Sequence, residues 1–270
     1  MQDITIVTVS TNRLDPDCLT SVEQTIAATP LKVTHVIVDN NSSQYEAHSY
    51  VKKYAPHAQI ILRNKNHGFG AGNNRGAAEL PAKYYFFLNP DTKFSDSRIL
   101  KHLFDFMENN LHAGIAAPKL FSMNGQVQPS CWRWPKWYMP LVQRTNIFPK
   151  PFKETQDQYF IVNNLSDEHV SAVDWAQGSA LFVRGELFDE LGGFDERFFV
   201  YLEDTDLCRR SWTKNKPVYY VPQTSLCHVY NKESASKDRR LISNVLQVFQ
   251  SHLSRVHIYS WIKYHLKWLA

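Results

Sequence analysis

Short apolar runs alternate with helical segments over residues 1–90, and this alternation limits the fold more than any other feature of the chain. Buried strands are predicted at residues 4–9, 33–38, 59–62 and 84–88, because these runs are short and most are rich in β-branched or aromatic side chains. Helices are predicted over residues 15–28, where Asp15 is the cap and Pro16 the first helical residue, over 44–54, and from about Asn74 to Leu80. This order predicts an α/β fold in which helices flank a mostly parallel sheet.

Polar segments follow three of these strands, at residues 8–13, 39–43 and 89–91. The carboxyl ends of parallel strands lie at one edge of a sheet, and ligands of such folds bind beyond that edge. The sequence therefore predicts three ligand-binding loops on the same side of the molecule.

The rest of the chain has a less regular pattern. A helix is predicted over residues 95–110, and the stretch 121–170 is predicted to be irregular because of its prolines. Ordered structure resumes at 173–183, followed by a helix over 203–213, a strand over 218–221 and a helical pattern from Asp238 to the end. We expect one main domain over residues 1–230 and a C-terminal helical extension over 231–270.

Charge and cysteine content exclude several classes of protein. The four cysteines form no C-x-x-C pair, which favours buried, reduced thiols over a disulfide framework or a zinc site. The N-terminus lacks the basic region of a signal peptide, and no apolar run approaches the roughly 20 residues that span a bilayer. Residues 231–270 contain seven Lys and Arg against two acids, so the net charge of +4 belongs to this tail. Basic residues confined to a tail argue against nucleic-acid binding.

Three features could form a phosphate and metal site. Asn89 and Asp91 end a predicted strand, where a carboxylate can bind a hard divalent cation, although Asn-Pro-Asp is also a common turn. Glu203, Asp204 and Asp206 begin one helix, where acids also interact favourably with the helix dipole. At about 100° per residue, Glu203 and Asp206 should share a side while Asp204 points elsewhere, as a general base would. His228, near the late strand, is the third feature, although a lone histidine is more often structural.

These features resemble those of family 2 glycosyltransferases with the GT-A fold. The matching stretches are residues 38–42, 66–76, 87–92, 175–184 and 193–210, with His228 at the usual place, so the resemblance covers about residues 1–230 in the family's order. The resemblance implies an inverting transferase of the rhamnosyltransferase-like branch. It also implies that residues 1–230 are the catalytic domain.

The resemblance implies a role for each matching residue. Asp39 would bind the pyrimidine base of the donor, and Asp204 would be the catalytic base. Asp91 and His228 would hold a divalent cation, Mg²⁺ or Mn²⁺, at the donor diphosphate. Trp175 and Glu203 would bind the acceptor. The other donor-binding residues would be Val9, Thr11, Asn12, Asn73, Asn89 and Gly178.

One departure from the family pattern concerns the D-x-D metal motif, whose first acid is Asn89 here. An amide offers an oxygen without charge, so cation affinity is expected to be lower. The resemblance favours dTDP-L-rhamnose as the donor, and a glycan or polyprenyl-linked glycan of a surface polysaccharide as the acceptor. A UDP-hexose donor, or a sugar-nucleotide-binding protein without catalysis, are the alternatives. A nucleotidyltransferase would need a glycine-rich loop after the first strand, which residues 8–13 lack.

The C-terminal helical pattern is amphipathic. Ile258, Ile262, Leu266 and Leu269 form one stripe, with Ser260, Lys263, Tyr264 and Lys267 opposite. Apolar, aromatic and basic residues together predict that residues 238–270 lie on an anionic membrane surface. The alternative is a helix packed on the main domain or on a second subunit. We expect a cytoplasmic protein, peripheral to the inner face of the plasma membrane.

Overall fold

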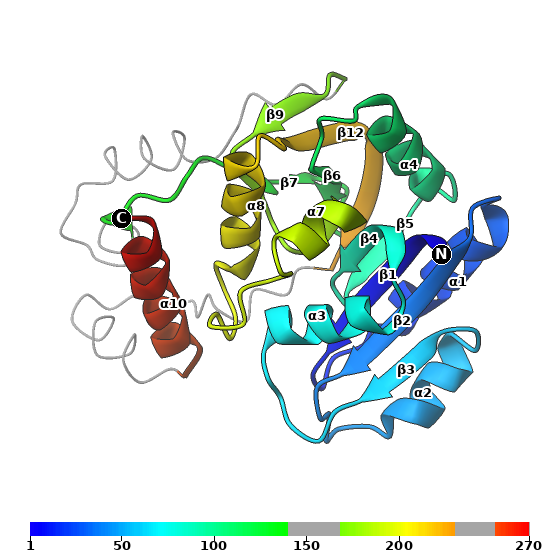
Figure 1. The fold of residues 1–270 in the computed structure, drawn as a ribbon. Helices are drawn as coiled ribbons and strands as arrows, with labels where there is room; N and C mark the ends of the chain where they lie inside the picture. Colours follow the sequence, from blue (N-terminus) through cyan, green and yellow to red (C-terminus); the bar gives the residue numbers. More distant parts are fainter. Residues whose placement is uncertain (140–167, 230–251, 270) are drawn as a thin grey trace.

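The computed structural model describes residues 1–139, 168–229 and 252–269. A central sheet with the strand order β3-β2-β1-β4-β11-β6-β12-β5 forms its middle layer, and helices cover both faces (Figure 1). The strands are β1 (Gln2–Ser10), β2 (Val33–Asp39), β3 (Gln59–Leu62), β4 (Ala82–Leu88), β5 (Thr92–Phe94), β6 (Ile115–Phe121), β7 (Val127–Gln128), β8 (Cys131–Trp132), β9 (Ser171–Val173), β10 (Trp175–Ala176), β11 (Ala180–Arg184) and β12 (Val218–His228). The helices are α1 (Pro16–Ala28), α2 (Ala47–Tyr54), α3 (Phe69–Glu79), α4 (Ile99–Asn109), α7 (Gly185–Glu190), α8 (Glu203–Thr213) and α10 (His252–Trp268).

The strands β3, β2, β1 and β4 are parallel, as the alternating pattern of the first 88 residues predicts. Their carboxyl ends therefore lie at one edge, with the three predicted ligand loops. Beyond β4 the sheet is mixed, because β11 is antiparallel to both β4 and β6, while β6 and β12 are parallel. The α/β class is confirmed, and the parallel arrangement applies to its N-terminal half.

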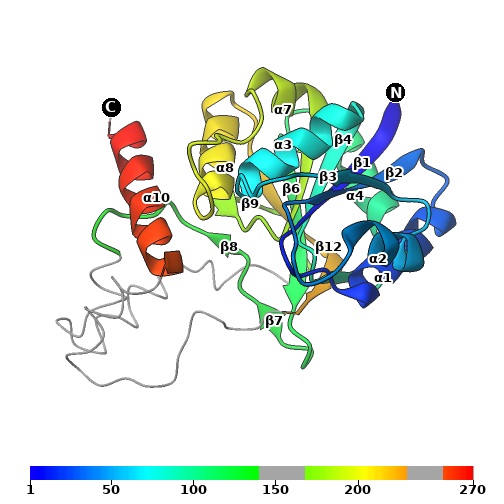
Figure 2. The same ribbon diagram turned by 90° about the horizontal axis from the view of Figure 1, so that it is seen from below.

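Helices on the two faces bury different sides of the same strands. On one face Val7 and Val9 of β1 pack in a cluster with residues of α3, α7 and α8. On the other face Ile4 and Ile6 pack with residues of α1 and α4, while α2 covers β2 near the sheet edge. Figure 2 shows these layers from below. Three of the four cysteines are buried, and all four are free thiols.

Several elements differ from their predicted bounds. The helix α3 begins at Phe69 rather than near Asn74, so it includes the glycine-rich residues before the predicted start. A Cβ at Gly72 would lie 2.7 Å from Val9, and one at Gly76 would lie 2.4 Å from Val7, so the glycines let this helix lie directly on β1. The helix α4 begins at Ile99 rather than Ser95.

The stretch between residues 115 and 121 was not predicted as a strand, yet it forms β6 in the middle of the sheet. Pro118 has no N–H for the ladder, and the register of β12 shifts beside it, between Val221 and Ser225. The strand β12 then continues to His228 rather than ending at the predicted residue 221. Most of the stretch predicted to be irregular, residues 140–167, lies outside the described residues.

The helix α10 lies beside α8 in both views (Figures 1 and 2). Tyr264 is fully buried and packs with Phe198 and Leu202, so the face that bears Ser260 and Tyr264 contacts the main domain. Ile262, Leu266 and Leu269 are 50%, 67% and 74% exposed, so the apolar stripe faces outward. None of the helices in the described part of the chain combines the length and the hydropathy of a membrane-spanning helix. The predicted helical residues 238–251 lie outside the described part of the chain.

Candidate active site

The loop after β2 presents a buried carboxylate. Asp39 is 5% exposed, and its Oδ2 accepts a hydrogen bond from the Ser42 N–H at 2.9 Å. Its Oδ1 is buried and has no hydrogen-bond partner among the described residues, and the same is true of the amide oxygens of Asn40 and Asn73. Buried oxygens without donors are costly, so this edge of the sheet fits a ligand that supplies N–H or O–H groups.

The loop after β1 contains the next predicted residues. Val9 is buried beneath α3, Thr11 is exposed, and Asn12 adopts a left-handed backbone with φ 56°. The Asn12 Oδ1 accepts hydrogen bonds from the N–H groups of Ser43, at 2.6 Å, and Gln44, at 3.0 Å. The side-chain oxygen of Asn12 therefore joins this loop to the loop after β2.

Asp91 and His228 face each other across the carboxyl ends of β4 and β12. His228 Nε2 lies 3.3 Å from Asp91 Oδ1, and both side chains are at least 90% buried. Arg13 Nη2 lies 3.1 Å from Asp91 Oδ2 and 3.3 Å from the carbonyl oxygen of Val229. Arg13 lies in a predicted ligand loop, but no role was predicted for it. Its position directly after β1 could have indicated that it binds the same ligand.

A cavity of about 320 Å³ lies at the carboxyl end of β4. Its lining residues include Asn89 at the end of β4, Gly178 before β11, and Glu203 and Asp204 at the start of α8. Asn89 Nδ2 donates to Ser179 Oγ at 3.2 Å, which fixes the amide against the loop before β11. The cavity therefore brings Asn89, Gly178 and Asp204 together, whereas Asp91 and His228 are not among its lining residues.

Asp204 is held by three donors. Its Oδ2 accepts from the Gly178 N–H at 2.8 Å, and its Oδ1 accepts from the Thr205 N–H at 2.7 Å and from the Thr205 hydroxyl at 3.2 Å. Burial raises the pKa of Asp204 above the ordinary aspartate value despite these donors. The group can therefore accept a proton more readily than an exposed aspartate can.

Glu203 lies beside Asp204 in the same cavity wall. Burial and the neighbouring Asp204 charge raise the pKa of Glu203 well above the ordinary glutamate value. Its Oε2 is buried and has no hydrogen-bond partner among the described residues. More donors favour the charged form of Asp204 than that of Glu203, so in this pair Glu203 keeps the proton and Asp204 ionises first.

The helical-wheel expectation for these acids is wrong. Glu203 and Asp204 both line the cavity, whereas Asp206 is fully buried and bonds Arg210 and two residues of α10. The reason is that the cavity meets the N-terminal end of α8, with residues 200–205 in its wall, so consecutive residues of the first turn can both reach it.

Aromatic rings form the outer wall of the cavity. Trp175 stacks on Trp132 with ring centroids 5.9 Å apart, and its Nε1–H donates to the carbonyl oxygen of Arg133 at 3.0 Å. Tyr201 and His257 also line the cavity, with ring centroids 4.7 Å apart. Trp175 was predicted, but Trp132, Tyr201 and His257 were missed, because their separation along the chain gives no local signal.

The amino-acid sequence matches the model of a known protein family. A protein-family model described as Glycosyl transferase family 2 matches residues 5–163, which is more than half of the chain. The chain belongs to glycosyl transferase family 2. The N-terminal part of the site, from Asp39 to Asp91, lies within the matched residues of this glycosyltransferase, and Asp204 and His228 lie beyond them.

Two relatives of this glycosyltransferase are rhamnosyltransferases. An N-acetylglucosaminyl-diphospho-decaprenol L-rhamnosyltransferase of Mycobacterium tuberculosis is 26% identical over 233 residues, which cover 78% of this chain and 71% of the relative. Rhamnosyltransferase WbbL of Escherichia coli (strain K12) is 27% identical over 184 residues, which cover 63% of this chain and 64% of the relative. The glycosyltransferase therefore has rhamnosyltransferase relatives at modest identity.

Solved structures confirm the GT-A fold. The crystal structure of GalNAc-T7 with UDP, GalNAc and Mn²⁺ superposes with a TM-score of 0.64 at 14% identity, over 92% of this chain and 48% of that one. The mannosyltransferase PcManGT from Pyrobaculum calidifontis, in complex with GDP-Man and Mn²⁺, gives a TM-score of 0.55 at 15% identity, over 86% of this chain and 58% of that one. The glycosyltransferase thus spans about half the length of the GalNAc-T7 chain.

Proposed function

We propose that this glycosyltransferase binds a nucleotide-diphosphate sugar beyond the carboxyl ends of β1, β2 and β4 and transfers the sugar, with inversion, to a hydroxyl group of a glycan or lipid-linked glycan. The observation on which the proposal depends is the shared cavity of Asn89 and Asp204. It places the end of β4, where the donor is expected, next to a carboxylate that can accept a proton.

The nucleotide is assigned to the edge formed by β1, β2 and α3. The partnerless Oδ1 of Asp39 would accept the ring N–H of a pyrimidine base, and the Asn73 amide oxygen would accept a donor group of the same ligand. Val9 gives this pocket an apolar floor, and the exposed Thr11 lies at its rim. Asn12 contributes by fixing the two loops around the base, because its side-chain oxygen accepts hydrogen bonds from Ser43 and Gln44.

The diphosphate is assigned to Asp91, His228 and Arg13. Gln128 Oε1 lies 3.1 Å from His228 Nδ1, so in the neutral ring Nδ1–H donates to Gln128 and the Nε2 lone pair faces Asp91. One imidazole nitrogen and one carboxylate oxygen fit Mg²⁺ or Mn²⁺, although no group of three such ligands occurs among the described residues. A bound cation would neutralise charge on the departing diphosphate, and Arg13 adds a permanent positive charge beside it.

Asp204 is assigned the proton transfer. In its ionised form the carboxylate takes the proton of the acceptor hydroxyl, whose oxygen then attacks the anomeric carbon from the face opposite the diphosphate. Gly178 and Thr205 hold the carboxylate in place throughout. Trp175 offers a flat apolar surface to a sugar ring, and the protonated Glu203 can donate a hydrogen bond to an acceptor oxygen.

The donor we favour is dTDP-L-rhamnose, because two relatives are named rhamnosyltransferases. The Mycobacterium relative also has a diphospho-decaprenol in its name, which supports a polyprenyl-linked acceptor and a role in surface polysaccharide synthesis. A UDP-hexose donor is the alternative. A protein that binds sugar nucleotides without transferring sugar is a further alternative, because Asn89 replaces an acid.

Thermal stabilisation by a panel of sugar nucleotides tests the donor. With MnCl₂ present, dTDP-L-rhamnose at about 100 times its Kd should stabilise the protein by about 2.7 kcal/mol, and UDP-glucose and GDP-mannose should stabilise it less. Asp39→Asn should remove this shift, because one oxygen of the carboxylate becomes an N–H donor. Equal stabilisation by all three nucleotides would refute the rhamnose assignment, and release of dTDP over time separates an enzyme from a binding protein.

We also propose that the outward stripe of α10 lies on an anionic membrane surface, at the inner face of the plasma membrane in the cytoplasm. Tyr259, Ile262, Leu266 and Leu269 are exposed on one side of this helix, and the excess of basic residues in 231–270 favours anionic lipids. Flotation with anionic and with zwitterionic liposomes tests this placement. The double variant Ile262→Ser/Leu266→Ser should float less with anionic vesicles, and equal flotation of variant and wild type would reject it.

A further inference from the structure

The segment from Asp195 to Leu202 leads directly into α8 and is held from two sides. On the side of α3, Asn74 bonds both backbone polar groups of Phe194, at 2.8 and 2.9 Å, and the N–H of Phe69 donates to the carbonyl oxygen of Phe199 at 2.9 Å. On the other side it is covered by α10. We call residues 195–202 the α8 lead-in.

The helix α10 bonds the backbone of the α8 lead-in directly. Ser260 is 2% exposed, and its hydroxyl donates to the carbonyl oxygen of Val200 at 2.9 Å. The Lys263 ammonium donates to the carbonyl oxygen of Arg197. These contacts tie two carbonyl groups of the lead-in to consecutive turns of one helix.

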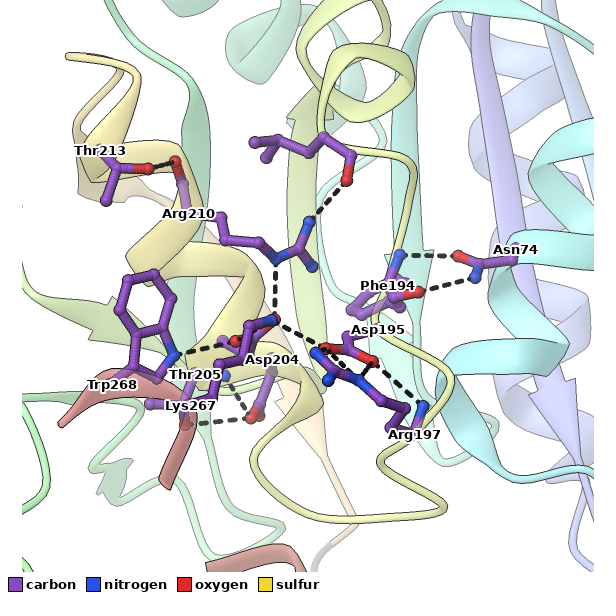
Figure 3. A network of polar contacts seen from close by, with 12 residues as sticks. Asn74, Phe194, Asp195, Arg197, Asp204, Thr205, Arg210, Thr213, Lys267 and Trp268 are labelled. Carbon is purple, nitrogen blue, oxygen red and sulfur yellow. Dashed lines mark hydrogen bonds and ion pairs between the residues drawn. The ribbon is translucent and has the colours of Figure 1, made fainter. Parts of the chain in front are cut away.

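A buried charge cluster fixes the end of α10 (Figure 3). Lys267 Nζ lies 2.7 Å from Asp195 Oδ2 and 2.7 Å from Asp206 Oδ1, so it joins the beginning of the lead-in to α8. The Trp268 Nε1–H donates to Asp206 Oδ1 at 2.9 Å, and Arg210 donates to Asp206 Oδ2 at 2.7 Å. The Asp206 side chain is completely buried and the Lys267 side chain is 23% exposed, so this carboxylate is sensitive to the loss of one partner.

Aromatic packing completes the contact. Tyr264 is buried between the helix and the lead-in residues Phe198 and Leu202. The guanidinium of Arg209, on α8, lies 4.5 Å from the ring centroid of Trp268 and donates to the Tyr264 hydroxyl at 3.1 Å. Thus α10 contacts α8 and its lead-in as part of one packed unit.

The lead-in has an unfavourable backbone where it reaches the cavity. Tyr201 and Leu202 have φ values of 71° and 70°, and such conformations persist in residues other than glycine only where the surroundings impose them. The next two residues, Glu203 and Asp204, line the cavity. His257, one turn before Ser260 on α10, lines the same cavity next to Tyr201.

We propose that α10 is a positioning element of the active site, which holds the left-handed α8 lead-in so that Asp204 faces the cavity and which supplies the cavity wall at His257. The catalytic unit then extends beyond residue 230 and includes residues 252–268. The expected effect on turnover rests on the proposed function, whereas the expected effect on hydrogen exchange does not. In this role Lys267 and Ser260 are positioning residues that act through Asp204.

Paired lysine variants test the proposal in the full-length protein. Lys267→Met removes the charge from the buried cluster, and the control Lys214→Met removes an exposed ion pair with Glu190 at the other end of α8. In Lys267→Met, hydrogen exchange of peptides over residues 195–208 should accelerate by about tenfold, while peptides of β1 and β4 remain protected. Lys214→Met should exchange at the wild-type rate in both regions.

Turnover and nucleotide binding provide the second readout. For Lys267→Met we expect release of dTDP from dTDP-L-rhamnose to slow by about tenfold or more, while calorimetric binding of dTDP with MnCl₂ stays within about twofold of wild type. If Lys267→Met does not fold, Ser260→Ala decides, because it removes a single hydrogen bond and should still accelerate exchange of residues 195–208. Unchanged exchange in the variant that folds would overturn the proposal. If wild type turns over no sugar nucleotide, the donor assignment fails, and the exchange readout still decides the role of α10.

Discussion

Replacing Asp204 with asparagine tests the centre of the proposed mechanism, because asparagine keeps the shape and removes the ability to accept a proton. Loss of a general base typically costs a factor of 10² to 10⁴, which corresponds to about 3–5 kcal/mol on the activation barrier. Both carboxylate oxygens of Asp204 accept hydrogen bonds, one from the Gly178 N–H and one from the Thr205 N–H. The NH₂ group of the asparagine variant must therefore face one of these two donors, and that hydrogen bond is lost. That lost bond costs about 1–3 kcal/mol.

The loss of stability is partly offset, because the substitution removes a negative charge beside Glu203 and so relieves repulsion in a buried pair. We therefore expect the melting temperature of Asp204→Asn to fall by only a few degrees, at about 2–4 °C per kcal/mol for a domain of this size. The donor-induced thermal shift should be retained.

The assay is initial-rate release of dTDP from dTDP-L-rhamnose with the acceptor glycan, at saturating donor. Glu203→Gln is the matched control, because glutamine resembles the protonated acid that we assign to Glu203, and its rate should fall by less than about tenfold. The rate of wild type should fall at acidic pH, with an inflection above the ordinary aspartate pKa, since burial raises the pKa of Asp204. Near-normal turnover of Asp204→Asn, or equal losses in the two variants, would refute the assignment.

Glu203→Gln and three glycine substitutions test the surroundings. Glu203 ionises near pH 4.5 in the unfolded chain and only at higher pH when folded, so the free energy of unfolding should fall as pH rises through this interval, and Glu203→Gln should flatten the fall in denaturant titrations. Gly178→Ala should lower kcat at least tenfold with little change in stability, because a Cβ would lie 3.3 Å from the base carboxylate, and rates equal to wild type would contradict this. Gly68→Ala should lower the free energy of unfolding by more than about 3 kcal/mol, since its φ is 94° and a Cβ would lie 2.1 Å from a backbone oxygen. Gly125→Ala, with φ 78° and open space around it, should cost only about 1–2 kcal/mol, and similar losses at both glycines would show that the close contact is not the cause.

The local pattern of the chain was enough to predict the N-terminal half of the fold. The cap at Asp15, the strand over residues 59–62 and the helix over residues 203–213 were predicted at their observed bounds. Such elements follow from side-chain periodicity and capping, which are properties of neighbouring residues. The sequence also predicts that the ligand loops lie at one edge of the sheet, because the carboxyl ends of parallel strands meet there.

Long-range contacts decided the rest. The strand β6 pairs with the nearby β7, but the two partners that place it inside the sheet, β11 and β12, come from residues 180–228, and nothing near Pro118 indicates them. Arg13 meets Asp91 and Val229 only because the ends of β1, β4 and β12 converge. Two acids meet in the cavity because its wall includes the start of α8, and periodicity does not say which end of a helix faces a cavity.

By itself the sequence determined that α10 would be an amphipathic helix with an apolar stripe, since that follows from spacing alone. Tertiary structure alone decided that the opposite side, with Ser260, Tyr264 and Lys267, is the buried one, because its partners are the Asp206 carboxylate and the α8 lead-in, more than 50 residues earlier in the chain. The physical reason is that a helical wheel gives directions relative to one axis, whereas burial depends on which surface the folded chain places beside that axis.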